Sequence, residues 1–257
     1  MNVLMNTIKR DLNYLINIKN ISLSIIIFII ITLFTLININ NFESDISFLD
    51  FIILNLGGIT IEYINALNFL KWFLPIILFT FFIVNFIYKE WDGRYIYSLI
   101  RIKSMNIWIF SKIFSLTFFS ILYVSLYYII LAIFYNIFNV SSFNIKNLFI
   151  LTCTFVLMCL LFMVISLITI LLSLLLKEST HSYLIICAIL IEPFFQKIIP
   201  IKFLPFLIGE NGMIARHNLS FSKSLNLSFK WSFIYFLLTY LLLIILITFT
   251  IKRKDFN

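Results

Sequence analysis

Six stretches of nearly uninterrupted apolar residues run along the chain, and the shorter segments between them carry most of the charges. A helix of about 20 apolar residues is long enough to cross the hydrocarbon core of a bilayer. The pattern therefore predicts an all-α polytopic membrane protein with six transmembrane helices, over residues 21–37, 72–88, 113–135, 148–176, 183–199 and 231–251. The fifth stretch is the least apolar because it contains Glu192, Pro193 and Lys197. Five spans, with residues 183–199 only dipping into the membrane, is the competing topology.

The segments outside the spans predict further elements of a single membrane domain, residues 1–257. In residues 1–19 apolar side chains recur at helical spacing opposite a polar and basic side, which is typical of an amphipathic helix in the headgroup layer. A charged leader without fixed structure is the alternative. Residues 38–71 are acidic and are broken by Gly57 and Gly58, which favours short helices on the outer face. Residues 200–230 are interpreted as an outer loop, and Pro75 is expected in the first turn of the second span, where its missing N–H costs little.

The composition excludes most soluble classes of protein. Hydrophobic residues make up 62% of the 257 residues and charged residues 12%, with a mean hydropathy of +1.09. Soluble domains average about 45–50% apolar and about 25% charged residues, so a soluble enzyme, a disordered chain and a disulfide-rich secreted domain are excluded. The three cysteines lie in apolar stretches and are expected to pack as small hydrophobic side chains.

The net charge of +8 is better explained by orientation in a membrane than by nucleic acid, and no nucleic-acid partner is expected. With both termini inside the cell, twelve Lys and Arg residues fall in cytoplasmic segments and seven in outer segments. Cytoplasmic loops carry the excess of Lys and Arg in membrane proteins. The count therefore favours an N-in, C-in topology.

No segment has the residues that nucleotide binding or hydrolysis needs. The five glycines form no G-x-x-x-x-G-K-[ST] loop, and the H-E-x-x-H zinc motif and the nucleophile elbow are missing. His181 and His217 stand alone in the sequence, so no catalytic, cofactor-binding or metal-binding residue is expected. Glu192 is an ionisable residue inside a span and so a candidate functional group. The favoured interpretation is that Pro193 ends the helix early and leaves Glu192 near the outer interface, where Lys197 could pair with it.

Residues 89–112 (KEWDGRYIYSLIRIKSMNIWIFSK) join the second and third spans on the cytoplasmic side. The segment carries seven charges and alternates them with apolar side chains, which a fully solvated loop would not need. A short helix with an apolar and a charged face would dock on another protein. A juxtamembrane helix that lies on anionic lipid is the alternative.

The order of these elements resembles that of the permease subunits of type-2 ABC exporters over nearly the whole chain. In that family the segment after the second span reads as an acidic residue, a glycine, apolar turns, a Pro-centred turn with a serine, and a basic residue that opens the third span. The matching residues here are Glu90, Gly93, Leu99, Ile100, Ser104 and Lys112. Ile102 stands where the family has its proline, so the turn departs from the pattern. The tail, Lys252-Arg253-Lys254-Asp255, resembles the family's common ending.

The resemblance implies a non-catalytic permease in a bacterial cell membrane that pairs with an identical or homologous permease chain. Two copies of a separate ATPase subunit would bind ATP and Mg²⁺ and would grip a coupling helix. The coupling residues would be Lys89, Glu90, Asp92, Gly93, Arg94, Leu99, Arg101, Lys103, Ser104 and Lys112. Short re-entrant helices would follow the fifth span, with Glu192 and Pro193 as a possible outer gate. The small size and the abundance of Phe and Ile resemble the lantibiotic and bacteriocin immunity or peptide-export branch, whose substrates are hydrophobic or amphipathic peptides. A membrane-embedded immunity protein that binds without transport, or an intramembrane enzyme, are the alternatives.

Overall fold

The computed structural model describes residues 2–39, 47–59, 65–91, 105–137, 148–176, 178–195, 198–217 and 227–254, and these are nearly all helical. The expected all-α class is confirmed. The helices are α1 (Asn2–Leu15), α2 (Ile18–Ile39), α3 (Phe48–Leu56), α4 (Ala66–Trp91), α6 (Met105–Ile137), α7 (Leu148–Leu175), α8 (Ser179–Ile191), α9 (Ile208–Gly212) and α10 (Phe229–Lys254). Three 3-10 helices lie between α8 and α10: η2 (Glu192–Phe195), η3 (Ile201–Phe206) and η4 (Ile214–Arg216).

Five of the described helices are long and apolar enough to cross a membrane: α2, α4, α6, α7 and α10. Each contains one of the expected spans, apart from Leu176, which lies one residue beyond the end of α7. The expected fifth span, residues 183–199, has no full-length counterpart. α8 has 13 residues and ends directly before Glu192 and Pro193, and at 1.5 Å per residue it rises about 20 Å, less than the ~30 Å hydrocarbon core.

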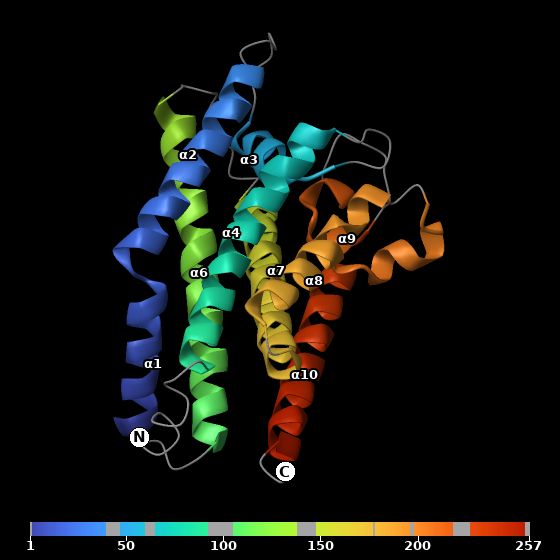
Figure 1. Ribbon diagram of the computed structural model, residues 1–257. Coiled ribbons are helices and arrows are strands. Elements are labelled where there is room, and N and C mark those ends of the chain that lie inside the picture. Colours follow the sequence, from blue (N-terminus) through green and yellow to red (C-terminus); the bar gives the residue numbers. More distant parts are fainter. Residues whose placement is uncertain are drawn as a thin grey trace.

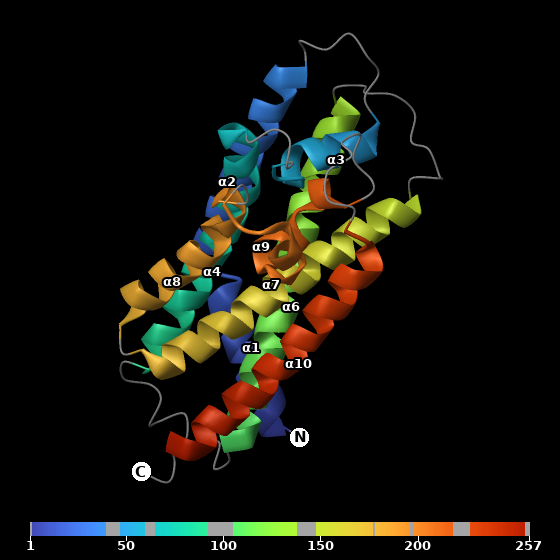
Figure 2. The same cartoon turned by 90° about the vertical axis from the view of Figure 1, so that its right-hand side faces the viewer.

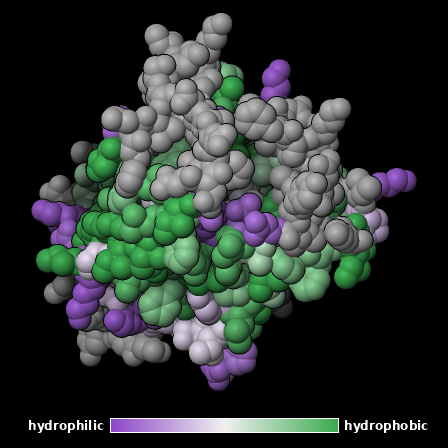
Figure 3. Space-filling view, turned by 90° about the horizontal axis from the view of Figure 1, so that it is seen from above, coloured by the Kyte–Doolittle hydropathy of each residue, from purple (hydrophilic) through white to green (hydrophobic). Residues whose placement is uncertain are grey.

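The chain nevertheless returns to the end at which it started. The beginning of α1 and the end of α10 lie at the same end of the molecule in two perpendicular views (Figure 1, Figure 2). α8 leads the chain part of the way back from the lower end of α7, and the short helices after it reach the start of α10 (Figure 1). Seen from the opposite end, the described surface is mainly hydrophobic, with smaller hydrophilic patches (Figure 3).

α4 forms the centre of the bundle. In the most apolar stretch of α4, 72% of the residues are buried, whereas in the corresponding stretch of α10 only 22% are. Phe79 on α4 stacks on Phe119 of α6, with ring centroids 5.5 Å apart, and meets Phe162 of α7 edge to face at 4.8 Å. These aromatic contacts fasten three long helices to one another.

Pro75 lies in the interior of α4, because the helix begins at Ala66 and not at Trp72. The expectation that it occupies the first turn is wrong. Membrane helices tolerate an interior proline where neighbouring side chains satisfy the freed backbone groups. The carbonyl that loses its helical N–H donor is that of Lys71, four residues before the proline. The Tyr123 hydroxyl of α6 donates to the carbonyl of Pro75 itself at 2.9 Å, which joins α6 to α4 at the proline.

The short helix α3 bears out the expectation of a short helix before Gly57 and Gly58. Ser47 and Asp50 form a capping box at its start, and the helix ends at Gly57. Gly58 has φ +78°, a conformation that suits glycine. The Gly57 carbonyl then accepts from the Ala215 N–H at 3.0 Å, which joins α3 to η4.

Candidate functional site

Three of the ten expected coupling residues lie in the described part of the chain. Lys89 and Glu90 are in the last turn of α4, and Lys112 is in the second turn of α6. The other expected coupling residues lie outside the described residues: Asp92, Gly93, Arg94, Leu99, Arg101, Lys103 and Ser104. The described residues therefore show how both ends of residues 92–104 are held.

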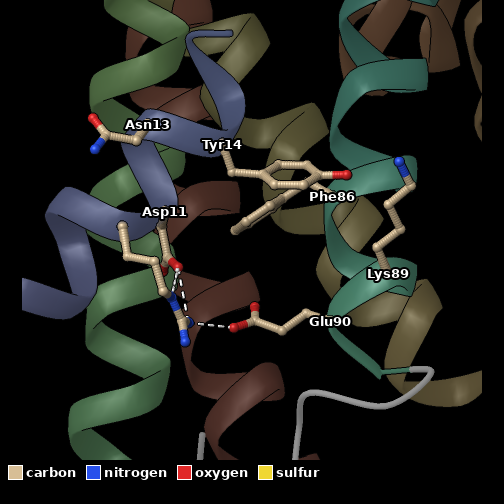
Figure 4. Close-up of a pocket in the computed structure, with 7 residues that line it drawn as sticks. Asp11, Asn13, Tyr14, Phe86, Lys89 and Glu90 are labelled. Atoms are coloured by element: carbon tan, nitrogen blue, oxygen red, sulfur yellow. Dashed lines mark hydrogen bonds and ion pairs between the residues drawn. The ribbon is translucent and has the colours of Figure 1, made fainter.

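The two ends meet in a cluster of four charged side chains, Arg10, Asp11, Glu90 and Lys112, which we call the charge cluster. Lys112 Nζ donates to Asp11 Oδ2 at 2.7 Å and also contacts Glu90 Oε2. Arg10 Nη2 lies 2.5 Å from Glu90 Oε1 and 3.0 Å from Asp11 Oδ1. Each carboxylate thus bridges both cations, and the ion pairs connect α1, α4 and α6. Figure 4 shows the contacts of Arg10 with Asp11 and with Glu90.

Three of the four side chains are removed from solvent. The exposed fraction is 1% for Asp11, 8% for Glu90 and 5% for Lys112, whereas Arg10 is 49% exposed. Lys112 Nζ also lies 4.7 Å from the centroid of the Phe86 ring. Buried charges cost several kcal/mol each unless paired, so this arrangement is stable only while α1, α4 and α6 stay together.

The geometry of α1 explains how Asp11 comes to face inward. Ile8, Asp11 and Leu15 are spaced three and four residues apart, so they share one face of the helix, and all three are buried. Lys9, Arg10 and Asn13 are exposed, as the expected polar side requires. α1 packs along the first half of α6 (Figure 1). The amphipathic helix is confirmed, and its position in the headgroup layer stays a prediction.

Tyr88 ties the same turn of α4 to a second junction. Its hydroxyl lies 2.8 Å from the Glu178 carbonyl, directly before α8, and 2.9 Å from the Ser182 hydroxyl in the first turn of α8. Tyr88 and Glu90 therefore connect one helix end to α1, α6, α7 and α8. A displacement of this turn would therefore change the contacts of each of these helices.

A pocket of about 250 Å³ lies between α1 and α4, beside the charge cluster. Its walls are the rings of Tyr14 and Phe86, 5.4 Å apart, and Lys89 Nζ lies 5.7 Å from the centroid of the Tyr14 ring. Figure 4 shows Tyr14 reaching from α1 toward α4 above the Arg10–Glu90 contact. The remaining lining residues are Arg10, Asp11, Asn13 and Glu90.

A second polar network lies far from the termini, between α8 and α10, and we call it the distal network: Glu210, Asn211, Arg216, His217 and Ser232. Arg216 Nε lies 3.1 Å from Glu210 Oε2, and both side chains are fully buried. His217 Nδ1 donates to the Met213 carbonyl at 3.0 Å, because a carbonyl can only accept. The Ser232 hydroxyl lies 2.9 Å from His217 Nε2 and 2.8 Å from Asn211 Oδ1, which joins α9 to α10.

Burial changes the protonation chemistry of this network. It raises the pKa of the Glu210 carboxyl to about 7, and the Arg216 guanidinium, which favours the ionised form, offsets the effect only in part. Burial also lowers the pKa of His217 to about 4, so its imidazole is neutral at pH 7. Within the described residues no three His, Cys, Asp or Glu side chains come together as metal ligands would.

Glu192 and Pro193 stand where α8 ends, as the proline predicts. Lys197, the expected partner of Glu192, lies outside the described residues. Glu192 Oε1 instead accepts from the Gly209 N–H at 3.0 Å, so it fastens the end of α8 to α9. Pro193 is buried next to the same glycine.

Sequence reasoning missed the partners in both networks. Asp11 is a single acidic residue in a basic helix, and the one signal for it in the sequence is its position on the apolar face three residues after Ile8. The sequence pattern places Arg216 and His217 in an outer loop and gives Glu210 no distinguishing feature. His181 is exposed in the first turn of α8 and lies 2.9 Å from the Glu178 carboxylate.

The profile of a family described as a protein of unknown function (DUF2705) matches residues 23–257, so the chain belongs to that family. No curated protein and no solved structure matches the chain.

Proposed function

We propose that this DUF2705 protein is the transmembrane permease subunit of a type-2 ABC exporter, with no enzymatic activity of its own. It would pair with an identical or homologous permease chain and with two copies of an ATPase subunit that binds ATP and Mg²⁺. The substrate would be a hydrophobic or amphipathic peptide, such as a bacteriocin, moved outward across a bacterial cell membrane. Both the exporter class and the substrate rest on the resemblance described above.

The charge cluster is the observation that carries the proposal. A coupling helix must transmit force, so its two ends need rigid attachment to the spans that it moves. Glu90 precedes residues 92–104 by two positions and Lys112 follows them by eight, and the two side chains contact each other. A solvated loop would not need this brace, because exposed ion pairs contribute only ~0–1 kcal/mol.

The contacts of the last turn of α4, which holds Tyr88 and Glu90, supply a route by which movement of the ATPase subunits would reach the spans. When the ATPase subunits close, a push on residues 92–104 would reach α1 and α6 through the charge cluster and α7 and α8 through Tyr88. Rigid-body displacement of packed helices is a common form of alternating access. The apolar exposed faces of α2 and α10 would let a membrane-bound peptide enter from the lipid.

The topology in this proposal has six crossings, with both termini in the cytoplasm. The shared end of α1 and α10 supports an even number of crossings (Figure 1). α8 with η2 would supply the short crossing, and the short helices after it, η3, α9 and η4, would form the re-entrant segment, with Glu192 and Pro193 at the outer gate. The cytoplasmic excess of Lys and Arg, twelve against seven, supports the orientation.

The test is to co-express the chain with a candidate ABC-type ATPase subunit from the same organism and to replace residues 92–104 by a glycine–serine linker of equal length. We expect the complex to lose peptide export and the stimulation of ATP hydrolysis, while the permease still elutes as a folded protein. The matched control replaces residues 138–147, which join α6 to α7 at the opposite end, and it should retain both activities. Normal export with the first linker would refute the coupling role. Protection against the peptide that persists with a hydrolysis-deficient ATPase would favour a binding protein over an exporter.

A further inference from the structure

The pocket between α1 and α4 lies near the start of the α2 span and near the end of the α4 span. The apolar run of α2 starts at Ile18, four residues after Tyr14, and that of α4 ends at Glu90, four residues after Phe86. The pocket therefore opens at the boundary between apolar and charged surface. The packed rings of Tyr14 and Phe86 give its lining an apolar part, which suits the apolar part of a ligand, beside the charged side chains of Arg10 and Lys89.

The charges around this pocket do not balance. Asp11 and Glu90 are both neutralised within the charge cluster, by Arg10 and Lys112. On α1, α2 and α4 the cations Lys9, Lys19 and Lys89 are exposed, and none of these three makes an ion pair with another described residue. Lys89 is the one of the three that lines the pocket. The rim of the pocket thus carries a positive charge that no described carboxylate compensates.

We propose that this pocket binds the phosphate group of an anionic phospholipid, with Lys89 as its cationic ligand and Tyr14 and Phe86 as the wall against the glycerol and the first methylene groups. The half-exposed Arg10 adds a second donor at the same rim. A Lys near the membrane surface attracts anionic lipid by ~1 kcal/mol, which corresponds to about fivefold in affinity. The proposal does not depend on the exporter function.

The bound lipid would also brace the contact between α1 and α4. Tyr14 and Lys89 come from different helices, so a ligand held by both resists their separation. A ligand that binds only while α1 and α4 are packed together stabilises that packing by mass action. Anionic lipid would therefore support the same helix end that the charge cluster holds.

The experiment uses the full chain, purified in a zwitterionic detergent and stripped of lipid. Dioleoylphosphatidylglycerol, dioleoylphosphatidylcholine and inorganic phosphate are titrated separately, and bound lipid is counted by native mass spectrometry alongside the melting temperature. We expect phosphatidylglycerol to bind and to raise the melting temperature, and the other two probes to do neither. Lys89→Gln should weaken phosphatidylglycerol binding about fivefold, and Lys89→Arg should retain it.

The matched control is Lys19→Gln, which removes an exposed cation at the same end outside the pocket. It should change the affinity less than twofold. Equal losses in the two Gln variants would mean a diffuse charge effect and would overturn the site. Equal binding of phosphatidylcholine would overturn the requirement for negative charge, and binding of inorganic phosphate as tightly as the lipid would overturn the lipid as ligand.

Discussion

Lys112→Met tests whether the charge cluster holds α1, α4 and α6 together. Methionine keeps the unbranched stem and much of the volume of lysine, and it removes the ammonium group that contacts Asp11 and Glu90. Two carboxylates that are 1% and 8% exposed would then share Arg10 alone. Arg10 is half exposed, so it compensates only part of the lost attraction.

The expected cost follows from this burial. Removing one member of a buried ion pair destabilises a protein by about 3–5 kcal/mol, because the remaining charge stays buried and unpaired. Since Arg10 still bridges both carboxylates, we expect the lower end of that range, ~3 kcal/mol. Asp11→Asn in the same background removes the charge that Lys112→Met leaves behind. The double variant should therefore be more stable than the sum of the two single effects by ~2 kcal/mol.

The assay is the free energy of unfolding in mixed micelles of a mild detergent and increasing sodium dodecyl sulfate. Lys19→Met is the matched control, because Lys19 is exposed at the same end and outside the cluster; it should stay within ~0.5 kcal/mol of the wild type. Strict additivity of Lys112→Met and Asp11→Asn would show that the two groups do not interact. A Lys112→Met variant as stable as the control would refute the brace itself.

Three further predictions concern other parts of the fold. Tyr88→Phe should cost ~1–2 kcal/mol of unfolding free energy, because it leaves the Glu178 carbonyl and Ser182 without the hydroxyl. Tyr127→Phe is its control and should cost nothing, because the buried Tyr127 hydroxyl has no hydrogen-bond partner among the described residues; a larger loss for Tyr127→Phe would contradict the argument. The pKa of Glu210 is raised to about 7, so the folded state binds the carboxyl proton more tightly than the unfolded chain does. The stabilisation that comes from this proton is fully present below about pH 4.5 and is lost as the pH rises through 7. The melting temperature of Glu210→Gln should therefore rise relative to that of the wild type between pH 5 and pH 8, and parallel curves would refute the assignment. Gly58→Ala should lower stability by ~1–2 kcal/mol, because φ is +78° and a Cβ would lie 2.7 Å from the Met213 side chain; an unchanged melting temperature would show that the turn relaxes freely.

The long helices could be predicted from sequence because the bilayer imposes one simple requirement. A run such as residues 148–176 has no charge and is long enough to cross, and the helix over Leu148–Leu175 follows almost residue by residue. The break at Glu192 and Pro193 was also predictable, because proline removes a helical N–H. The start of α4 at Ala66 was not predictable, because proline suits the first turn of a helix better than its interior, and Pro75 lies nine residues into α4.

The sequence by itself determined the membrane class, the five long apolar helices and the basic character of the segments around the shared end. These follow from composition and periodicity, which act on each segment separately. Only the tertiary structure decided that Asp11 meets Lys112 across 101 positions of the chain, and that Glu210 meets Arg216 in a fully buried pair. A buried charge acquires its partner from whichever helix packs against it, and helix packing depends on the shapes of all the side chains at once.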